Sequence, residues 1–299
     1  MNSTSNEPMW VRPIAGALAS QTADFFTYPI DTAKTRLQIS GELGNKQLYS
    51  GMFDAIKKVR ANEGFTSGLY KGFSAALLRQ GGYRAIVFTI YEPLRDAFGP
   101  QSLMAKILSA GVGGAIGIVC VNPLDVLKVR MQADIHGTRY KNLRSGFREL
   151  VFTEKLTGMF RGVIPNAQRA FLVNAAELAT YDVLKKHSIT YFGDNIISYF
   201  IGSIGAGLAA SLVSTPVDLV KTRLMNQPTD PITHKGLQYS GAMDCALKTC
   251  KAEGFWGIYK GFLPTWLRLG PYNLITFLAF EEYRRALRTQ YTNEVTQLE

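Results

Sequence analysis

The chain has 299 residues and a formal net charge of +10 at neutral pH. A basic balance of this kind suits nucleic acid, an anionic membrane surface or anionic solutes as partners. Because the bases are dispersed and no nucleic-acid motif is present, nucleic acid is excluded, and a membrane with small anionic solutes is favoured.

The sequence predicts no enzyme, metal site or cofactor. The three cysteines form no paired framework, the three histidines lack ligand-like spacing, and no nucleophile–base pair or cofactor loop stands out. The first ten residues resemble neither a secretory signal nor an Arg-rich transit peptide, so we expect any targeting signal to be internal.

One motif, Pro-x-Asp-x-x-Lys-x-Arg, occurs three times along the chain. Its prolines stand at positions 29, 123 and 216, so that successive copies are 94 and 93 residues apart. An even period predicts one structural unit repeated three times around a shared core. We therefore expect a single transmembrane domain over 1–299, with repeats at 11–99, 102–191 and 195–289.

Each repeat opens with an apolar segment that we expect to cross the membrane as a helix. No charged residue occurs from Ile107 to Leu124 or from Ile196 to Val217, which approaches the roughly 20 residues that a span needs. Both stretches are rich in Gly, Ala and Ser, which suits closely packed membrane helices. Two buried core helices of a soluble protein are the alternative. The helices are expected to run past the motif to Gln38, Gln132 and Met225.

A polar loop and a short amphipathic segment come next in each repeat. These segments are too short and too charged to span, so we expect helices that lie along the membrane surface. They are Met52–Ala61, Leu143–Thr153 and Ala242–Ala252.

An aromatic-base-Gly triplet then begins a second long helix in each repeat. Free amides at a helix N-terminus, beside a base and an aromatic ring, suit the phosphate of a lipid head group. Plain anchoring at the membrane interface is the alternative. The triplets are Tyr70-Lys71-Gly72, Phe160-Arg161-Gly162 and Tyr259-Lys260-Gly261.

The second helix ends each time with an aromatic residue, an acid and a base. Two spans per repeat give six spans, with both chain ends on one side of the membrane. The endings are Tyr91-Glu92-x-x-Arg95, Tyr181-Asp182-x-x-Lys185 and Phe280-Glu281-x-x-Arg284.

Two rings of ion pairs follow from the threefold repetition. Charges inside a membrane face an interior or water and pair with one another. A pair within one helix, Asp31 with Lys34, is the simpler alternative, but it does not explain why all three copies keep the same order. We therefore expect pairs between repeats. The inner pairs are Asp31–Lys128, Asp125–Lys221 and Asp218–Lys34. The outer pairs are Glu92–Lys185, Asp182–Arg284 and Glu281–Arg95.

Three arginines lie at one level between the two rings. Arg79, Arg169 and Arg268 each stand twelve residues before the aromatic of the outer motif. A guanidinium group matches carboxylate, phosphate or sulfate oxygens, so these side chains are candidates to bind a small dianion. Binding to backbone carbonyls or lipid is the alternative for any one of them. Asp24 has no equivalent in the other repeats and could pair with a base or accept a proton.

The combination of three Pro-x-Asp-x-x-Lys motifs, three aromatic-base-Gly triplets and three aromatic-acid-x-x-base endings resembles the mitochondrial carrier family over roughly residues 10–288. The phrase Ala23 to Gln38 and the run Trp266 to Pro271 are similar to its uncoupling-protein and oxoglutarate–dicarboxylate carrier branch, and Arg169-Ala170 to an oxoglutarate carrier. The resemblance implies an all-α fold of six transmembrane helices in the mitochondrial inner membrane, with both termini toward the intermembrane space.

The resemblance also assigns roles to the rings and loops. It makes the inner ring a matrix gate braced by Gln38 and Gln132, and the outer ring a cytoplasmic gate braced by Tyr91 and Tyr181. Met225 and Phe280 replace the third brace of each ring, which predicts a looser interface there. Substrate contacts fall at Arg79, Arg169, Ala170 and Arg268. Cardiolipin sites fall at Gly51, Lys71, Gly72, Arg161, Gly162, Gly241, Lys260 and Gly261.

Three functions remain open at this point. The leading one is transport of a dicarboxylate, oxoacid, sulfate or phosphate by a monomeric carrier. A fatty-acid-dependent proton leak, with Asp24 as the proton site, is the second. A structural subunit of a larger inner-membrane complex is the third.

Overall fold

The computed structural model describes residues 11–44, 47–98, 103–135, 140, 142–193, 196–230 and 236–298. These residues are almost entirely helical, and one isolated bridge between Thr229 and Gly236 is the only extended pairing among them. The predicted all-α fold is confirmed. The long helices are α1 (Val11–Ile39), α3 (Phe73–Phe98), α4 (Leu103–Ala133), α7 (Val163–Phe192), α8 (Ile196–Asn226) and α10 (Phe262–Leu298).

Short helices connect the two long helices of each repeat. They are α2 (Met52–Glu63), α5 (Leu143–Glu149) with α6 (Lys155–Met159), and α9 (Ala242–Glu253). The middle repeat differs from the expected single helix, because α5 ends at Glu149 and a π-helical turn, Leu150–Glu154, separates it from α6. The motif prolines do not end their helices, since α1, α4 and α8 continue two to three turns beyond them.

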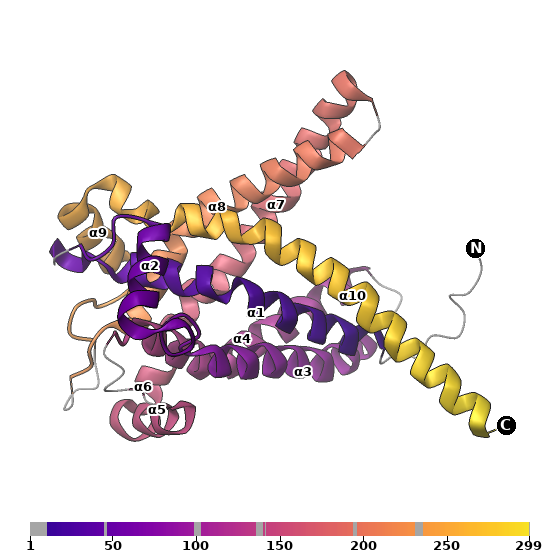
Figure 1. The fold of residues 1–299 in the computed structure, drawn as a ribbon, viewed down its shortest axis with the longest axis horizontal. Coiled ribbons are helices and arrows are strands. Elements are labelled where there is room, and N and C mark those ends of the chain that lie inside the picture. The colour runs from indigo at the N-terminus through magenta and orange to yellow at the C-terminus, as the bar shows by residue number, and fades with distance from the viewer. Residues whose placement is uncertain are drawn as a thin grey trace. The chain divides into compact units, whose positions relative to one another are not determined.

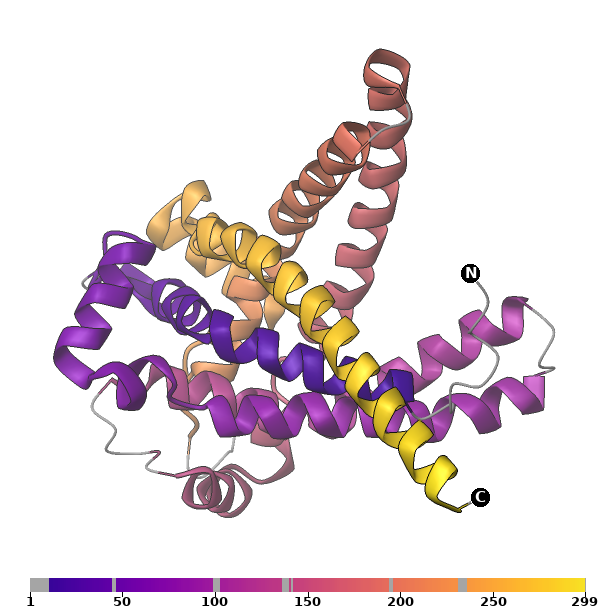
Figure 2. The same ribbon diagram turned by 45° about the vertical axis from the view of Figure 1, so that its right-hand side comes forward.

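Two compact units divide the chain, one of Met1–Tyr28 with Leu267–Glu299 and the other of Pro29–Trp266. In the smaller unit, the Thr22 and Tyr283 hydroxyls lie 3.0 Å apart and join the first half of α1 to α10. In the larger unit, α3 packs along α4 and α7 packs along α8, as both ribbon views show (Figure 1, Figure 2). Each packed pair joins one repeat to the next.

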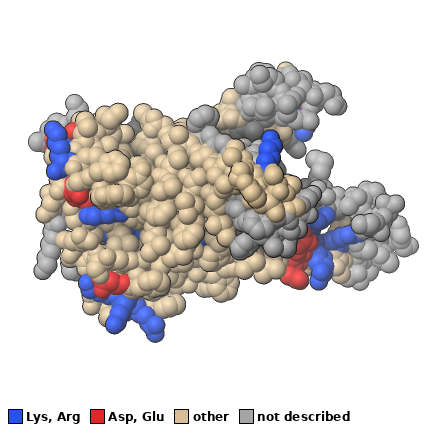
Figure 3. Space-filling view, turned by 90° about the horizontal axis from the view of Figure 1, so that it is seen from above, with Lys and Arg blue, Asp and Glu red and all other residues tan. Residues whose placement is uncertain are grey.

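The surface and the helix composition agree with a membrane setting. Two stretches of the described residues, Gly111–Ala133 and Ile204–Asn226, are long and apolar enough to cross a membrane. Large apolar side chains such as Phe26 and Phe277 are more than half exposed, which is expected where lipid covers a helix. Figure 3 shows a broad surface area without charged side chains among the residues described.

The triplet glycines have a conformational reason for being glycine. Gly72, Gly162 and Gly261 all have positive φ, of 81°, 72° and 94°, a region that other residues rarely adopt. A Cβ atom would also lie 3.0 Å from Met225 at Gly162 and 3.0 Å from Gln38 at Gly261. The turn that starts each second helix therefore packs directly against the end of another repeat's first helix.

Candidate functional site

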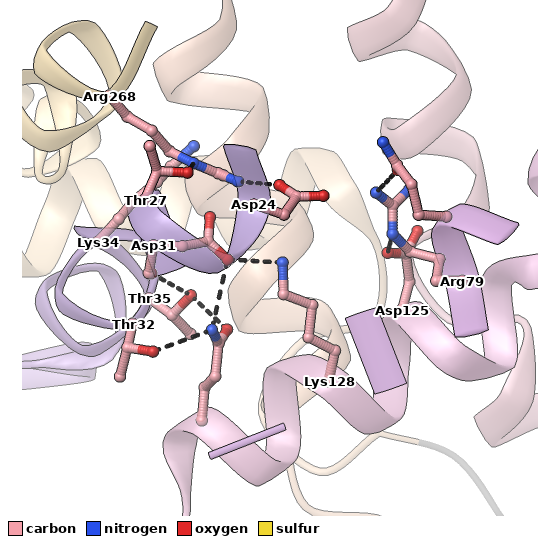
Figure 4. A network of polar contacts seen from close by, with 12 residues as sticks. Asp24, Thr27, Asp31, Thr32, Lys34, Thr35, Arg79, Asp125, Lys128 and Arg268 are labelled. Carbon is pink, nitrogen blue, oxygen red and sulfur yellow. Dashed lines mark hydrogen bonds and ion pairs between the residues drawn. The ribbon is translucent and has the colours of Figure 1, made fainter. Parts of the chain in front are cut away.

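A ring of three ion pairs joins the three repeats in the larger unit. The motif carboxylates are buried, and each lies against the motif lysine of another repeat, so the predicted cross-repeat arrangement is the one found (Figure 4). The distances are 2.6 Å for Lys128–Asp31, 2.5 Å for Lys34–Asp218 and 3.3 Å for Lys221–Asp125.

Two glutamines lie one helical turn beyond the motif lysines and brace two of these pairs. The Gln132 amide group donates to Asp31 Oδ2 at 3.4 Å and to Thr32 Oγ1 at 3.3 Å, and its oxygen accepts from Thr35 at 2.9 Å. The Gln38 oxygen accepts from Thr222 Oγ1 at 2.8 Å. Both glutamines are buried, so these hydrogen bonds form where water competes little.

The third interface is closed by apolar contacts in place of an amide. Met225, at the glutamine position, is fully buried in a cluster with Val126, Val129 and Leu150. The two valines occupy the motif positions at which the first repeat has Thr32 and Thr35. This interface also has the longest of the three ion pairs, in the direction that the missing brace predicts, although its side chains are packed.

A second set of charge pairs holds each motif arginine within its own repeat. Arg36 lies 2.7 Å from Glu63, Arg223 lies 2.6 Å from Glu253, and Arg130 binds Glu154 through both guanidinium nitrogens. Sequence reasoning missed these links. The signal was present, since each repeat has an arginine seven residues after its proline and a glutamate at its second junction.

The bases of the three triplets reach protein partners in the structure. Each side chain donates to the carbonyl group at the C-terminal end of the next repeat's first helix. The bonds are Lys71 to Asp134 O, Arg161 to Gln227 O at 3.5 Å, and Lys260 to Ser40 O at 3.3 Å. The C-terminal end of a helix carries partial negative charge and unpaired carbonyls. These bases therefore cap helices between repeats, a role that the sequence did not predict beside lipid binding.

The helix N-termini proposed for lipid differ among the repeats. Gly51 and Gly241 precede α2 and α9 in extended conformation, and neither helix has a side-chain cap. In the middle repeat, Asn142 and Ser145 cap the short helix α5 through a capping box. One pocket of about 730 Å³ is lined by Arg161, Gly162 and Gly241, and another of about 660 Å³ by Gly51, Lys260 and Gly261.

Two of the three candidate substrate arginines lie against the ring. Arg79 Nε is 3.4 Å from Asp125 Oδ1, and Arg169 forms an ion pair with Asp218. Both arginines are close enough to Lys221 to act on its charge. Counted with the six ring residues, they give five cationic groups and three carboxylates, which leaves two positive charges uncompensated within this set.

The third arginine has a different partner, in the smaller unit. Arg268 lies 2.7 Å from Asp24 and 3.3 Å from the Thr27 hydroxyl, and its guanidinium carbon lies 5.6 Å from the centre of the Tyr272 ring (Figure 4). The structure thus gives Asp24 the base partner that the sequence left open. Asp24 has no counterpart in the other repeats, where Ile118 and Ser211 stand at its position.

The outer ring is only partly described. The side chains of Glu92, Ala170, Tyr181, Asp182 and Lys185 lie outside the described part of the structure. Arg95 binds the neighbouring Asp96 at 2.9 Å and lies 5.9 Å from the Tyr91 ring. The proposed roles of Glu281 and Arg284 in this ring, and the outer pairs themselves, stay predictions.

A buried carboxyl group outside the spans lies in the loop after α1. Glu42, in the short turn η1 (Glu42–Gly44), contacts α9 and is 6% exposed. Burial raises the pKa of Glu42, while Arg223 acts in the opposite direction. Burial also raises the pKa of Tyr239, and that of Cys245 to about 12. Among the described residues, no group of three or more His, Cys, Asp and Glu could hold a metal ion.

Comparison with known proteins matches the whole pattern. The model of the mitochondrial carrier protein family matches three times, over residues 5–102, 99–192 and 193–291. Mitochondrial substrate carrier family protein ucpB of Dictyostelium discoideum is 39% identical over 94% of this chain and 97% of its own length. Putative mitochondrial transporter UCP3 of Sus scrofa is 37% identical over 93% and 92%, and Kidney mitochondrial carrier protein 1 of Xenopus laevis is 38% identical over 92% and 97%.

Proposed function

This chain belongs to the mitochondrial carrier family, and we propose that it exchanges small divalent anions across the mitochondrial inner membrane by alternating access. The proposed substrate class is a dicarboxylate or oxoacid of four or five carbons, sulfate or phosphate. The chain transports as a monomer, with both termini toward the intermembrane space and with the ring of motif charges as its matrix gate.

The charge balance beside the ring carries this proposal. Arg79 and Arg169 add two positive charges to a ring that is otherwise neutral, and each already binds a carboxylate. A dianion matches that surplus, whereas a neutral solute leaves two partly buried charges without compensation. Guanidinium groups bind carboxylate and phosphate through two parallel hydrogen bonds, which favours these anions over spherical ones.

The same contacts give a physical route from binding to gating. An anion that binds Arg79 and Arg169 withdraws them from Asp125 and Asp218, two carboxylates of the ring. Hydrogen bonds to charged groups contribute about 1.5–3 kcal/mol each. Two bidentate contacts are therefore large enough to supply the roughly 5.5 kcal/mol that converts a mostly closed gate to a mostly open one.

Exchange in proteoliposomes tests this function. Purified protein is reconstituted into liposomes loaded with malate, oxoglutarate, sulfate or phosphate, and uptake of each labelled anion is measured. We expect exchange with at least one anion and a loss of at least tenfold in Arg79→Gln and Arg169→Gln. Arg148→Gln, which removes the same charge from an exposed site on α5, is the matched control. No exchange with any of the four, or equal rates in all three variants, would overturn the proposal.

One observation favours proton leak as a second candidate. Asp24 is a carboxylate within a membrane helix, it is unique among the three repeats, and it pairs with Arg268. Release of this pair would leave a carboxylate able to accept a proton. Membrane potential in proteoliposomes with added fatty acid should decay at least threefold more slowly for Asp24→Asn. An unchanged decay rate would remove Asp24 from this role.

We propose cardiolipin as a structural lipid at two of the three junctions. The pockets beside Gly51 and Gly241 combine uncapped helix amides with a neighbouring base and glycine, namely Lys260-Gly261 and Arg161-Gly162. Such amides attract phosphate. The self-capped α5, beside Lys71-Gly72, makes the remaining junction the weakest of the three.

A further inference from the structure

The ion pair without a glutamine brace has another polar partner. Asn166, in the first turn of α7, donates its amide group to Asp125 Oδ2 at 2.9 Å and accepts from Lys221 Nζ at 2.8 Å. Both distances are shorter than the 3.3 Å between Lys221 and Asp125 themselves. One side chain thus bridges the two members of the pair through charge-assisted hydrogen bonds, which are stronger than neutral ones.

The other two repeats have no such bridge at the equivalent position. Four residues after the triplet glycine, the first repeat has Ala76 and the third has Thr265, where the second has Asn166. The Ala76 side chain has no polar atom, and the Thr265 hydroxyl donates to Gly261 O of its own helix at 2.7 Å. The amide is therefore present at the one interface where Met225 replaces the glutamine.

We propose that Asn166 is the positioning residue of the third gate interface, and that it takes the place of the missing glutamine brace. This inference rests on the proposed gate function of the ring. Met225 with Val126 and Val129 seals the apolar side of that interface, and Asn166 holds the charged pair from the second helix of the repeat. In the open gate, where Asp125 and Lys221 separate, a single side chain cannot keep both contacts.

The position of Asn166 also connects the gate to the candidate substrate site. Asn166 and Arg169 lie three residues apart on α7, and therefore on the same face of the helix. Arg169 binds Asp218 while Asn166 binds Asp125 and Lys221. A small shift or rotation of α7 on anion binding would disturb both contacts together, which a glutamine on a first helix would not do.

Asn166→Ala in lipid nanodiscs tests this role. Backbone hydrogen–deuterium exchange over residues 216–225 and the melting temperature report gate closure without any substrate. Two lost hydrogen bonds to charged groups correspond to about a tenfold smaller preference for the closed gate. We expect exchange in that segment to rise at least fivefold and the melting temperature to fall by several degrees. The matched control is Thr265→Ala, at the equivalent position of the third repeat, which should change neither.

A rewritten interface separates bracing from general packing. The triple variant Val126→Thr, Val129→Thr and Met225→Gln gives the third interface the side chains of the first. In that background Asn166→Ala should lose less than half of its effect, because the new glutamine supplies the brace. Equal effects in both backgrounds, or Asn166→Ala behaving like Thr265→Ala, would overturn the inference. If the triple variant does not fold, the comparison with Thr265→Ala decides alone. A failure of anion exchange leaves these outcomes unaffected.

Discussion

The buried pair between Arg130 and Glu154 offers a direct test of how the middle repeat is held together. Arg130 on α4 is 3% exposed and Glu154 is 2% exposed. The arginine binds both carboxylate oxygens and also donates from Nε to Met225 O at 2.8 Å. Arg161 lies 3.8 Å from the same carboxylate. Glu154→Gln keeps the shape of the side chain and removes its charge.

The expected loss is large because Arg130 keeps its charge after the change. Breaking a buried ion pair by removing one partner costs about 3–5 kcal/mol, and the remaining glutamine oxygen still accepts one hydrogen bond, so we expect about 3 kcal/mol. At about 2–4 °C per kcal/mol for a chain of this size, the melting temperature should fall by about 6–12 °C. Replacing both partners, Arg130→Met with Glu154→Gln, should restore part of this loss, because no uncompensated charge remains.

Thermal unfolding of the purified protein in detergent measures these differences. Asp54→Asn is the control, since it breaks the exposed Lys58–Asp54 pair on α2 and should change little. Burial opposes ionisation of Glu154, but the hydrogen bonds from Arg130 outweigh it and hold its pKa below the ordinary value. The wild-type advantage over Glu154→Gln should therefore persist above pH 4.5 and shrink only under more acidic conditions. A Glu154→Gln loss no larger than that of Asp54→Asn would refute the reasoning.

Three further results should follow from the contacts described. In proteoliposomes, Asp31→Lys or Lys128→Asp alone should reduce exchange at least tenfold, and the double reversal should restore at least a third of it; no restoration would argue against a direct pair. The raised pKa of Glu42 means that the folded protein retains its proton, so the wild type should lose stability relative to Glu42→Gln as pH rises above 4.5; parallel melting curves across pH would contradict this. Gly51→Asp should cap α2 and raise the melting temperature without cardiolipin, yet reduce the stabilisation that cardiolipin adds, and Gly241→Asp should act likewise at α9; cardiolipin stabilisation equal to wild type would exclude these amides as its site.

The ring itself could be predicted from the sequence because threefold repetition fixes it. Once Pro29 has equivalents at 123 and 216, each acid has two possible bases in other repeats, and closure of the ring in one direction selects one of them. The all-α fold and the continuation of α1 through its proline to the glutamine position followed from the same repetition. The ion pair of Lys34 with Asp218 needed no further information.

What the sequence did not show depends on contacts that break or cross the repetition. Asn166 looked like an ordinary helix residue, because its equivalents Ala76 and Thr265 have no common chemistry. The partner of Asp24 could not be predicted because Arg268, by symmetry, would reach the motif acid and not a residue two turns earlier on α1. The direction of a long side chain such as that of Lys260 depends on the packing of the turn before it, and sequence spacing contains no information on that direction.

The helix caps between repeats impose an order on how this protein can reach its native state. Lys260 bonds to Ser40, 220 residues earlier in the chain, and Lys34 pairs with Asp218 across 184 residues. Contacts of such separation form late. While the first two repeats are being made, Lys34 and Asp125 therefore wait without their partners, and the end of α1 remains uncapped. The three repeats are consequently one cooperative unit of assembly: a chain that stops before the third repeat keeps its helices but cannot close the circle that they were built to form.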